Sequence, residues 1–129
     1  MNKILVEVSA GELLDKLSIL EIKKEKIKDP NKIKFILDEY SILNEQFNKN
    51  IVSNQKIKKL YQSLKEINEK LWVIEDDKRQ CEKDKEFGEK FIKLSRDVHF
   101  YNDNRAKIKL EINNLTDSKI KEIKQYTNY

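Results

Sequence analysis

The chain is poor in residues that interrupt helices and in residues that bind metals. Its 129 residues include two glycines and one proline, and so few breaks are typical of long helices. A single cysteine, Cys81, cannot form an internal disulfide, which agrees with a reducing compartment. One cysteine and one histidine are also too few for a zinc-type ligand set. We therefore expect a helical protein with no metal and no other cofactor.

Long apolar runs are also missing. No stretch has the roughly 18 apolar residues that a membrane-spanning helix needs, and the first residues do not resemble a signal peptide. We therefore expect a cytoplasmic protein without a membrane span. The length suits one domain over residues 1–129.

The basic charge is small and dispersed. The formal net charge of +4 results from 27 basic residues that are interleaved with 23 acidic ones. A nucleic-acid-binding surface needs its basic residues clustered, so we interpret these charges as solvated helix faces. Nucleic acid is not an expected partner.

Arginine is rare and confined to one part of the chain. Only three of the 27 basic residues are arginines, namely Arg79, Arg96 and Arg105, and all three lie between Trp72 and Lys109. A guanidinium presents five donors in a rigid fork, which suits a fixed carboxylate or a bound anion better than lysine does. This part of the sequence is therefore the first place to look for a functional site.

The spacing of apolar residues predicts an all-α fold, an antiparallel bundle of three to four long helices after a short N-terminal extended segment. Capping signals support the helix starts: Ser9 and Glu12 form an S-x-x-E capping box, and the Asp29-Pro30 pair ends one helix and begins the next. Asn54 or Ser53 can cap the third helix, and Asp84 can cap the fourth. The predicted segments are an extended or strand-forming lead-in at 1–8, helices at 9–28, 30–49, 54–83 and 85–115, and a tail at 116–129 that packs on the bundle or pairs with the lead-in.

The third and fourth predicted helices have coiled-coil-like apolar seams and should form a hairpin. The seam of the fourth helix runs from Phe87 to Leu115 and is interrupted at Arg105. An arginine on a seam must be desolvated, reach water or line a cavity, and it needs a partner. Acids on the first helix are the candidate partners, namely Glu12, Asp15, Glu21 and Glu25.

Two further ion pairs are possible around the arginines. Glu75 and Asp76 precede Arg79 by four and three residues, a spacing at which helical side chains meet. Across the predicted hairpin, Glu75 could also pair with Arg96. We expect Trp72 to anchor the core or an interface with its indole N–H hydrogen-bonded.

Three stretches, residues 9–23, 71–79 and 102–109, resemble in combination the signature segments of an uncharacterised bacterial family, domain of unknown function 6165. The resemblance covers nearly the whole chain and implies a small, mostly helical protein with no established activity. Lys78 and His99 depart from the family pattern, and the second departure weakens a catalytic role for His99. The residues that match the pattern are Ser9, Gly11, Glu12, Asp15, Lys16, Glu21, Trp72, Glu75, Asp76, Arg79, Asn102, Asp103, Arg105 and Lys109.

Two functions remain open from the sequence. The first is a binding or assembly module, with a protein partner or self-association, in which an inter-helix Arg/Asp/Glu network fixes the helix pairing. The second is a small-anion site, enzymatic or not, in which Arg96, Arg105 and Lys109 hold the ligand and Glu75 or Asp103 acts as acid or base. The candidate site residues are Glu12, Asp15, Trp72, Glu75, Asp76, Arg79, Arg96, Asn102, Asp103, Arg105 and Lys109.

Overall fold

The computed structural model describes residues 2–118 and 124–129, and these contain four helices and no strand. The helices are α1 (Ala10–Lys26), α2 (Pro30–Asn50), α3 (Gln55–Lys83) and α4 (Glu89–Thr116). The predicted all-α class is confirmed. The described part of the lead-in, 2–8, forms neither a helix nor a strand. The predicted tail falls partly outside the described residues, at 119–123.

Side-chain caps begin the first three helices close to the predicted positions. The Ser9 hydroxyl accepts from the Glu12 backbone N–H at 3.1 Å, and the Asn54 side chain accepts from the Ile57 N–H at 2.9 Å. Asp29 caps α2 in the same way, with Pro30 in the first turn. These contacts satisfy backbone donors that would otherwise lack a partner in the first turn.

The predicted start of the fourth helix was wrong. Helix α4 begins at Glu89 with Gly88 as its N-cap and no capping side chain, and Asp84 instead ends α3. The backbone N–H of Asp84 donates to Gln80, and Lys85 then adopts a φ of 56°. This left-handed residue closes the α3 terminus, so the chain needs further residues before it can enter α4. Phe87 therefore lies in the connecting loop and is half-exposed instead of opening the seam.

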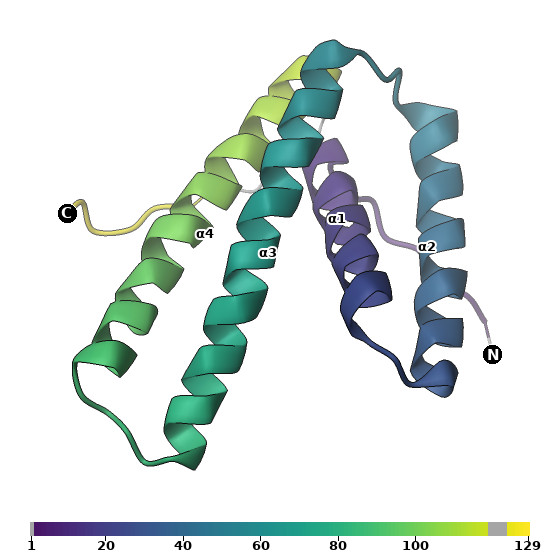
Figure 1. Cartoon of the computed structure of the whole chain (residues 1–129). Helices are drawn as coiled ribbons and strands as arrows, with labels where there is room; N and C mark the ends of the chain where they lie inside the picture. Colours follow the sequence, from purple (N-terminus) through teal and green to yellow (C-terminus); the bar gives the residue numbers. More distant parts are fainter. Residues whose placement is uncertain (1, 119–123) are drawn as a thin grey trace.

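Helix α1 is the central element of the fold (Figure 1). It packs against all three other helices, while α3 and α4 form an antiparallel hairpin. The core cluster takes residues from three helices: Leu13, Leu14 and Leu17 from α1, Ile57 and Leu64 from α3, and Ile112 from α4. Tyr40, Leu43 and Phe47 of α2 pack against this cluster from the other side. The position of α1 across the hairpin therefore determines the arrangement of the whole protein.

A tyrosine beside this core predicts a specific alkaline sensitivity. Burial, reinforced by the nearby Glu21 carboxylate, raises the pKa of the Tyr61 phenol above its ordinary value. The unfolded chain ionises this phenol near about pH 10, whereas the folded chain holds the proton longer. The stability that Tyr61 contributes is therefore fully present below about pH 10 and is lost as the pH rises towards the folded pKa.

Replacing Tyr61 with phenylalanine should make the fall in stability above about pH 10 shallower, by up to about 1.4 kcal/mol per pH unit. Urea unfolding at several pH values checks this. The exposed Tyr126 provides the matched control, because Tyr126→Phe should leave the alkaline slope unchanged. If the free energy of unfolding falls with pH equally steeply in Tyr61→Phe and in the wild type, the buried phenol does not determine the loss of stability at high pH.

Candidate functional site

A buried ion pair joins α1 to α4. Asp15 is 1% exposed, and its carboxylate accepts two hydrogen bonds from Arg105. The Arg105 Nε donates to Oδ1 at 2.9 Å, and Nη2 donates to Oδ2. This two-point contact matches the fork of the guanidinium to the plane of the carboxylate. Of the four acids that the sequence offered as partners for Arg105, the structure selects Asp15.

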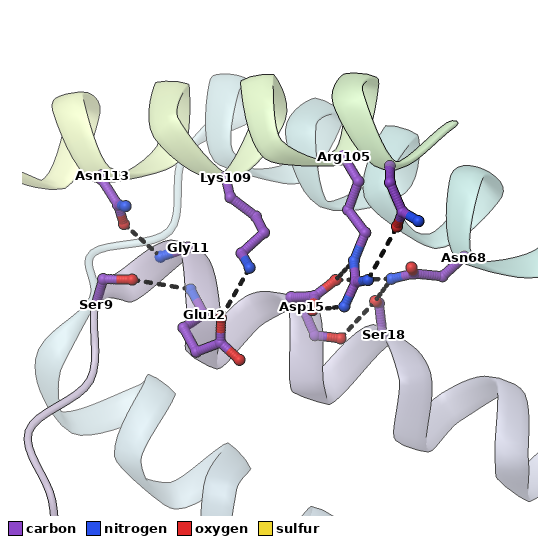
Figure 2. Close-up of polar contacts among 10 residues, drawn as sticks. Ser9, Gly11, Glu12, Asp15, Ser18, Asn68, Arg105, Lys109 and Asn113 are labelled. Atoms are coloured by element: carbon purple, nitrogen blue, oxygen red, sulfur yellow. Dashed lines mark hydrogen bonds and ion pairs between the residues drawn. The ribbon is translucent and has the colours of Figure 1, made fainter. Parts of the chain in front are cut away.

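Asn68 extends this ion pair to a third helix (Figure 2). Its Nδ2 donates to Asp15 Oδ1 at 2.9 Å and to the Ser18 hydroxyl at 2.8 Å, and that hydroxyl donates to the Asp15 backbone carbonyl at 2.7 Å. Asn102 accepts a longer contact of 3.5 Å from Arg105 Nη1. The network therefore links α1, α3 and α4 around one carboxylate. Each buried side-chain nitrogen or oxygen in the described ranges has a hydrogen-bond partner.

A second set of contacts fixes the start of α1 against the end of α4. Lys109 is buried, and its Nζ lies 2.8 Å from Glu12 Oε2. The Gly11 backbone N–H donates to Asn113 Oδ1 at 2.7 Å (Figure 2). The predicted capping box is therefore half formed: Ser9 caps the Glu12 N–H, but the Glu12 side chain points to Lys109 instead of back to the cap.

Gly11 is required by a close approach of two backbones. A Cβ at this position would lie 2.5 Å from the Lys109 carbonyl oxygen and 2.9 Å from Asn113 Oδ1. The first neighbour is a helix backbone atom and cannot rotate away. A side chain at Gly11 would therefore push α1 off α4 and break the contacts on both sides of it.

Sequence reasoning missed three members of this network: Ser18, Asn68 and Asn113. All three are buried, and each stands next to or among apolar positions of a helix. In α3 the polar Asn68 is buried more deeply than the neighbouring apolar residue Ile67. A polar residue one position from a seam was the available signal, but amides on solvated faces give the same pattern.

The predicted site residues do not converge on one place. Trp72, Glu75, Asp76 and Arg79 line a groove of about 350 Å³ beside α1, with Arg105 at one edge. A separate hollow of about 710 Å³ lies under residues 124–129 and is lined in part by Arg96, Asn102 and Asp103. The Tyr129 hydroxyl donates to the Asp103 carboxylate there. The three cations that were proposed to hold an anion, Arg96, Arg105 and Lys109, therefore do not line one common site.

The two further ion pairs considered from the sequence are not formed. Arg79 and Arg96 are both exposed, and within the described residues neither lies within ion-pair distance of Glu75 or Asp76. Trp72 is half-buried in the groove, and no described residue accepts from its indole N–H. The three arginines therefore have different environments, and only Arg105 is inserted between helices.

The described residues contain neither a metal-type cluster nor a membrane-spanning helix. Over 2–118 and 124–129, no cluster of three or more histidine, cysteine or acidic side chains is arranged to hold a metal ion. None of the four helices in those ranges has the length and apolar character needed to cross a membrane.

Comparison with known proteins identifies a family but no activity. A family model described as a family of unknown function (DUF6165) matches residues 4–129. No curated protein and no solved structure matches the chain significantly.

Proposed function

We propose that this chain, which belongs to the family of unknown function DUF6165, is a non-enzymatic helical binding or assembly module. In this proposal the Asp15–Arg105 network holds α1 in one position across the α3–α4 hairpin. The surfaces of the helices outside this junction are then available for a protein partner.

The two-point contact between Asp15 and Arg105 is the observation that supports this proposal. In a ligand-binding site the guanidinium donors of an arginine are directed into a cavity. Arg105 instead donates two hydrogen bonds to a buried carboxylate of its own chain. Lys109 forms an ion pair with Glu12 through a single contact of 2.8 Å. Because both cations already have acidic partners, a ligand would have to displace them at the cost of a buried, unpaired carboxylate.

A small-anion site is the second candidate, favoured by Arg79. This arginine lines the groove together with Trp72 and forms no ion pair with a described residue. Its neighbours Glu75 and Asp76 are acidic, however, so the groove as a whole does not favour an anion. The second candidate is therefore weaker than the first.

A thermal-shift screen separates the two candidates. We expect carboxylates, sugar phosphates and nucleotides to leave the melting temperature of the wild type unchanged. Arg105→Lys should lower the melting temperature by several degrees, because lysine keeps the charge but loses the two-point contact. Arg96→Lys is the matched control and should have no effect, since Arg96 is exposed. A ligand that stabilises the wild type and no longer stabilises Arg105→Lys would contradict a purely structural network.

A further inference from the structure

The lower half of the α3–α4 hairpin projects beyond the rest of the fold (Figure 1). Helix α1 ends about level with the middle of α3, and its Ile19 and Ile22 line the groove that also contains Trp72, Glu75, Asp76 and Arg79. Nearer the α3–α4 loop, the two helices run on with no third described helix beside them. We call residues 72–103 the arm. Its seam is covered unevenly: Ile74 and Cys81 of α3 are buried, whereas Phe91, Leu94 and Val98 of α4 are only half-buried. Exposed apolar side chains flank the seam, among them Val73, Ile92 and Phe100, each more than 40% exposed.

One face of the arm carries a charge pattern along α3. Trp72, Asp76, Arg79 and Lys83 follow each other at intervals of four, three and four residues, so they share one face of the helix. Glu75 lies beside Asp76 on the same face. We call these five residues the arm stripe. Its first half is acidic and its second half is basic, with an aromatic ring at the acidic end.

The four charges of the arm stripe are not neutralised within the described chain. Glu75, Asp76, Arg79 and Lys83 are exposed, and none of them is within ion-pair distance of an oppositely charged described residue. Elsewhere, exposed residues at the same spacing do pair, as Glu45 and Lys49 do at 3.0 Å. The acidic and basic ends of the stripe are therefore both available to a partner.

We propose that the partner of the arm stripe is a second copy of this chain, which packs arm to arm about a two-fold axis. This inference rests on the proposed assembly function and names its partner. A two-fold axis that crosses α3 between Asp76 and Arg79 makes the two α3 helices antiparallel. Positions that lie equally far from the axis, on opposite sides of it, then face each other. Arg79 of one copy meets Glu75 and Asp76 of the other, and Lys83 meets Trp72.

An acidic half followed by a basic half is self-complementary in this arrangement, which is the requirement for a two-fold interface. Parallel packing of the same stripes would instead place like charges together. The aliphatic stem and ammonium of Lys83 would cover the half-buried Trp72 ring, a contact that favours both groups. The two arms together would bring four helices side by side.

The accessible surface of the chain leaves room for such an interface. The chain exposes 9793 Å², whereas a compact monomer of this mass exposes about 7,200 Å². The exposed lead-in at 2–8, the exposed residues 124–129 and the exposed side chains of the arm all contribute to the difference. A stable interface of standard size needs only about 800 Å² from each partner.

Charge reversal tests this dimer. The acid-reversed variant carries Glu75→Lys and Asp76→Lys, so its stripe is wholly basic. The base-reversed variant carries Arg79→Glu and Lys83→Glu, so its stripe is wholly acidic. The charge-swapped variant carries all four changes and keeps the net charge of the wild type. Sedimentation velocity at ten to one hundred times the wild-type dissociation constant reports the mass of each variant, and circular dichroism shows that each one is folded.

We expect the wild type to be a dimer and each half-reversed variant to be a monomer. The charge-swapped variant should also dimerise, but more weakly than the wild type, because Lys83→Glu removes the ammonium from the Trp72 ring. An equimolar mixture of the two half-reversed variants should form a one-to-one dimer. The matched control is Glu45→Lys with Lys49→Glu on α2, which should remain dimeric like the wild type. A monomeric wild type at 200 μM, or half-reversed variants that dimerise like the wild type, would overturn the proposal.

Sedimentation velocity and the thermal-shift screen together distinguish a failure of the proposed dimer from a failure of the proposed assembly function. A monomeric wild type whose stability still depends on the Asp15–Arg105 pair removes the second copy as partner but leaves a binding module. A ligand found by thermal shift that depends on Arg105 removes the assembly function itself. Because one readout is mass and the other is melting temperature, the two failures are distinguishable.

Discussion

Replacing Arg105 with leucine should lower the free energy of unfolding by about 3–5 kcal/mol, because the substitution leaves the Asp15 carboxylate buried without its cation. Leucine would otherwise suit this position, since the neighbouring positions of the α4 seam are apolar. Urea unfolding followed by circular dichroism measures the change. The matched control is Arg96→Leu, which removes an exposed arginine with no acidic partner among the described residues and should stay within about 0.5 kcal/mol of the wild type.

An unchanged stability in Arg105→Leu would mean that the guanidinium contributes nothing where it lies. A gain in stability would mean that the arginine serves a purpose other than folding, as expected of a ligand-binding residue. Either result would contradict the structural role of the network.

Replacing Gly11 with alanine should cost about 2–4 kcal/mol, from overpacking against the α4 backbone and from loss of the Gly11–Asn113 hydrogen bond. The new Cβ would lie 2.5 Å from the Lys109 carbonyl oxygen, so α1 would have to move. Alanine is ordinarily the better helix former, which makes a large loss diagnostic of the close approach.

Gly88 is the internal control for this substitution. A Cβ there meets no atom within 4 Å, and the residue is an N-cap, where alanine costs at most about 1 kcal/mol relative to glycine. Melting curves of Gly11→Ala and Gly88→Ala, recorded side by side, give the comparison. A loss in Gly11→Ala as small as that in Gly88→Ala would mean that α1 and α4 can separate at little cost. That result would contradict the close approach of the two helices at Gly11.

Local signals in the sequence predicted most of the secondary structure. Ser9, Asn54 and the Asp29-Pro30 pair each act through neighbouring backbone atoms, so their effects can be read from the sequence. The start of α4 was harder to place, because Asp84 is acceptable both as an N-cap and as a C-terminal residue. The left-handed backbone at Lys85 decided between them, and no glycine marked that position in advance.

The candidate site was predictable only in part, for a physical reason. An arginine on an apolar seam requires a partner, so Arg105 and a short set of acids could be named. The choice of Asp15 over Glu12, Glu21 or Glu25 depends on the rotation and crossing of α1 relative to α4, which periodicity does not specify. The same rotation places Arg96 on another face of the fold. Candidate site residues that are close together in the sequence therefore lie apart in the structure.

The roles of the small and neutral residues could not be predicted. Gly11 matched the family pattern, but its contact with Lys109 depends on the distance between two helices. Asn68 and Asn113 are amides that occur equally well on solvated faces. Their function in the network follows from burial, which emerges only when the helices are assembled.

The most direct test of the central claim is a double-mutant cycle between Asp15 and Arg105. The cycle compares the unfolding free energies of the wild type, Asp15→Leu, Arg105→Leu and the double variant, so it isolates the interaction between the two side chains. If the pair holds α1 on the hairpin, each single change is strongly destabilising and the double variant recovers much of the loss, with a coupling of at least about 2 kcal/mol. Additive losses, with a coupling below about 0.5 kcal/mol, would show that the two residues act independently and would contradict the account.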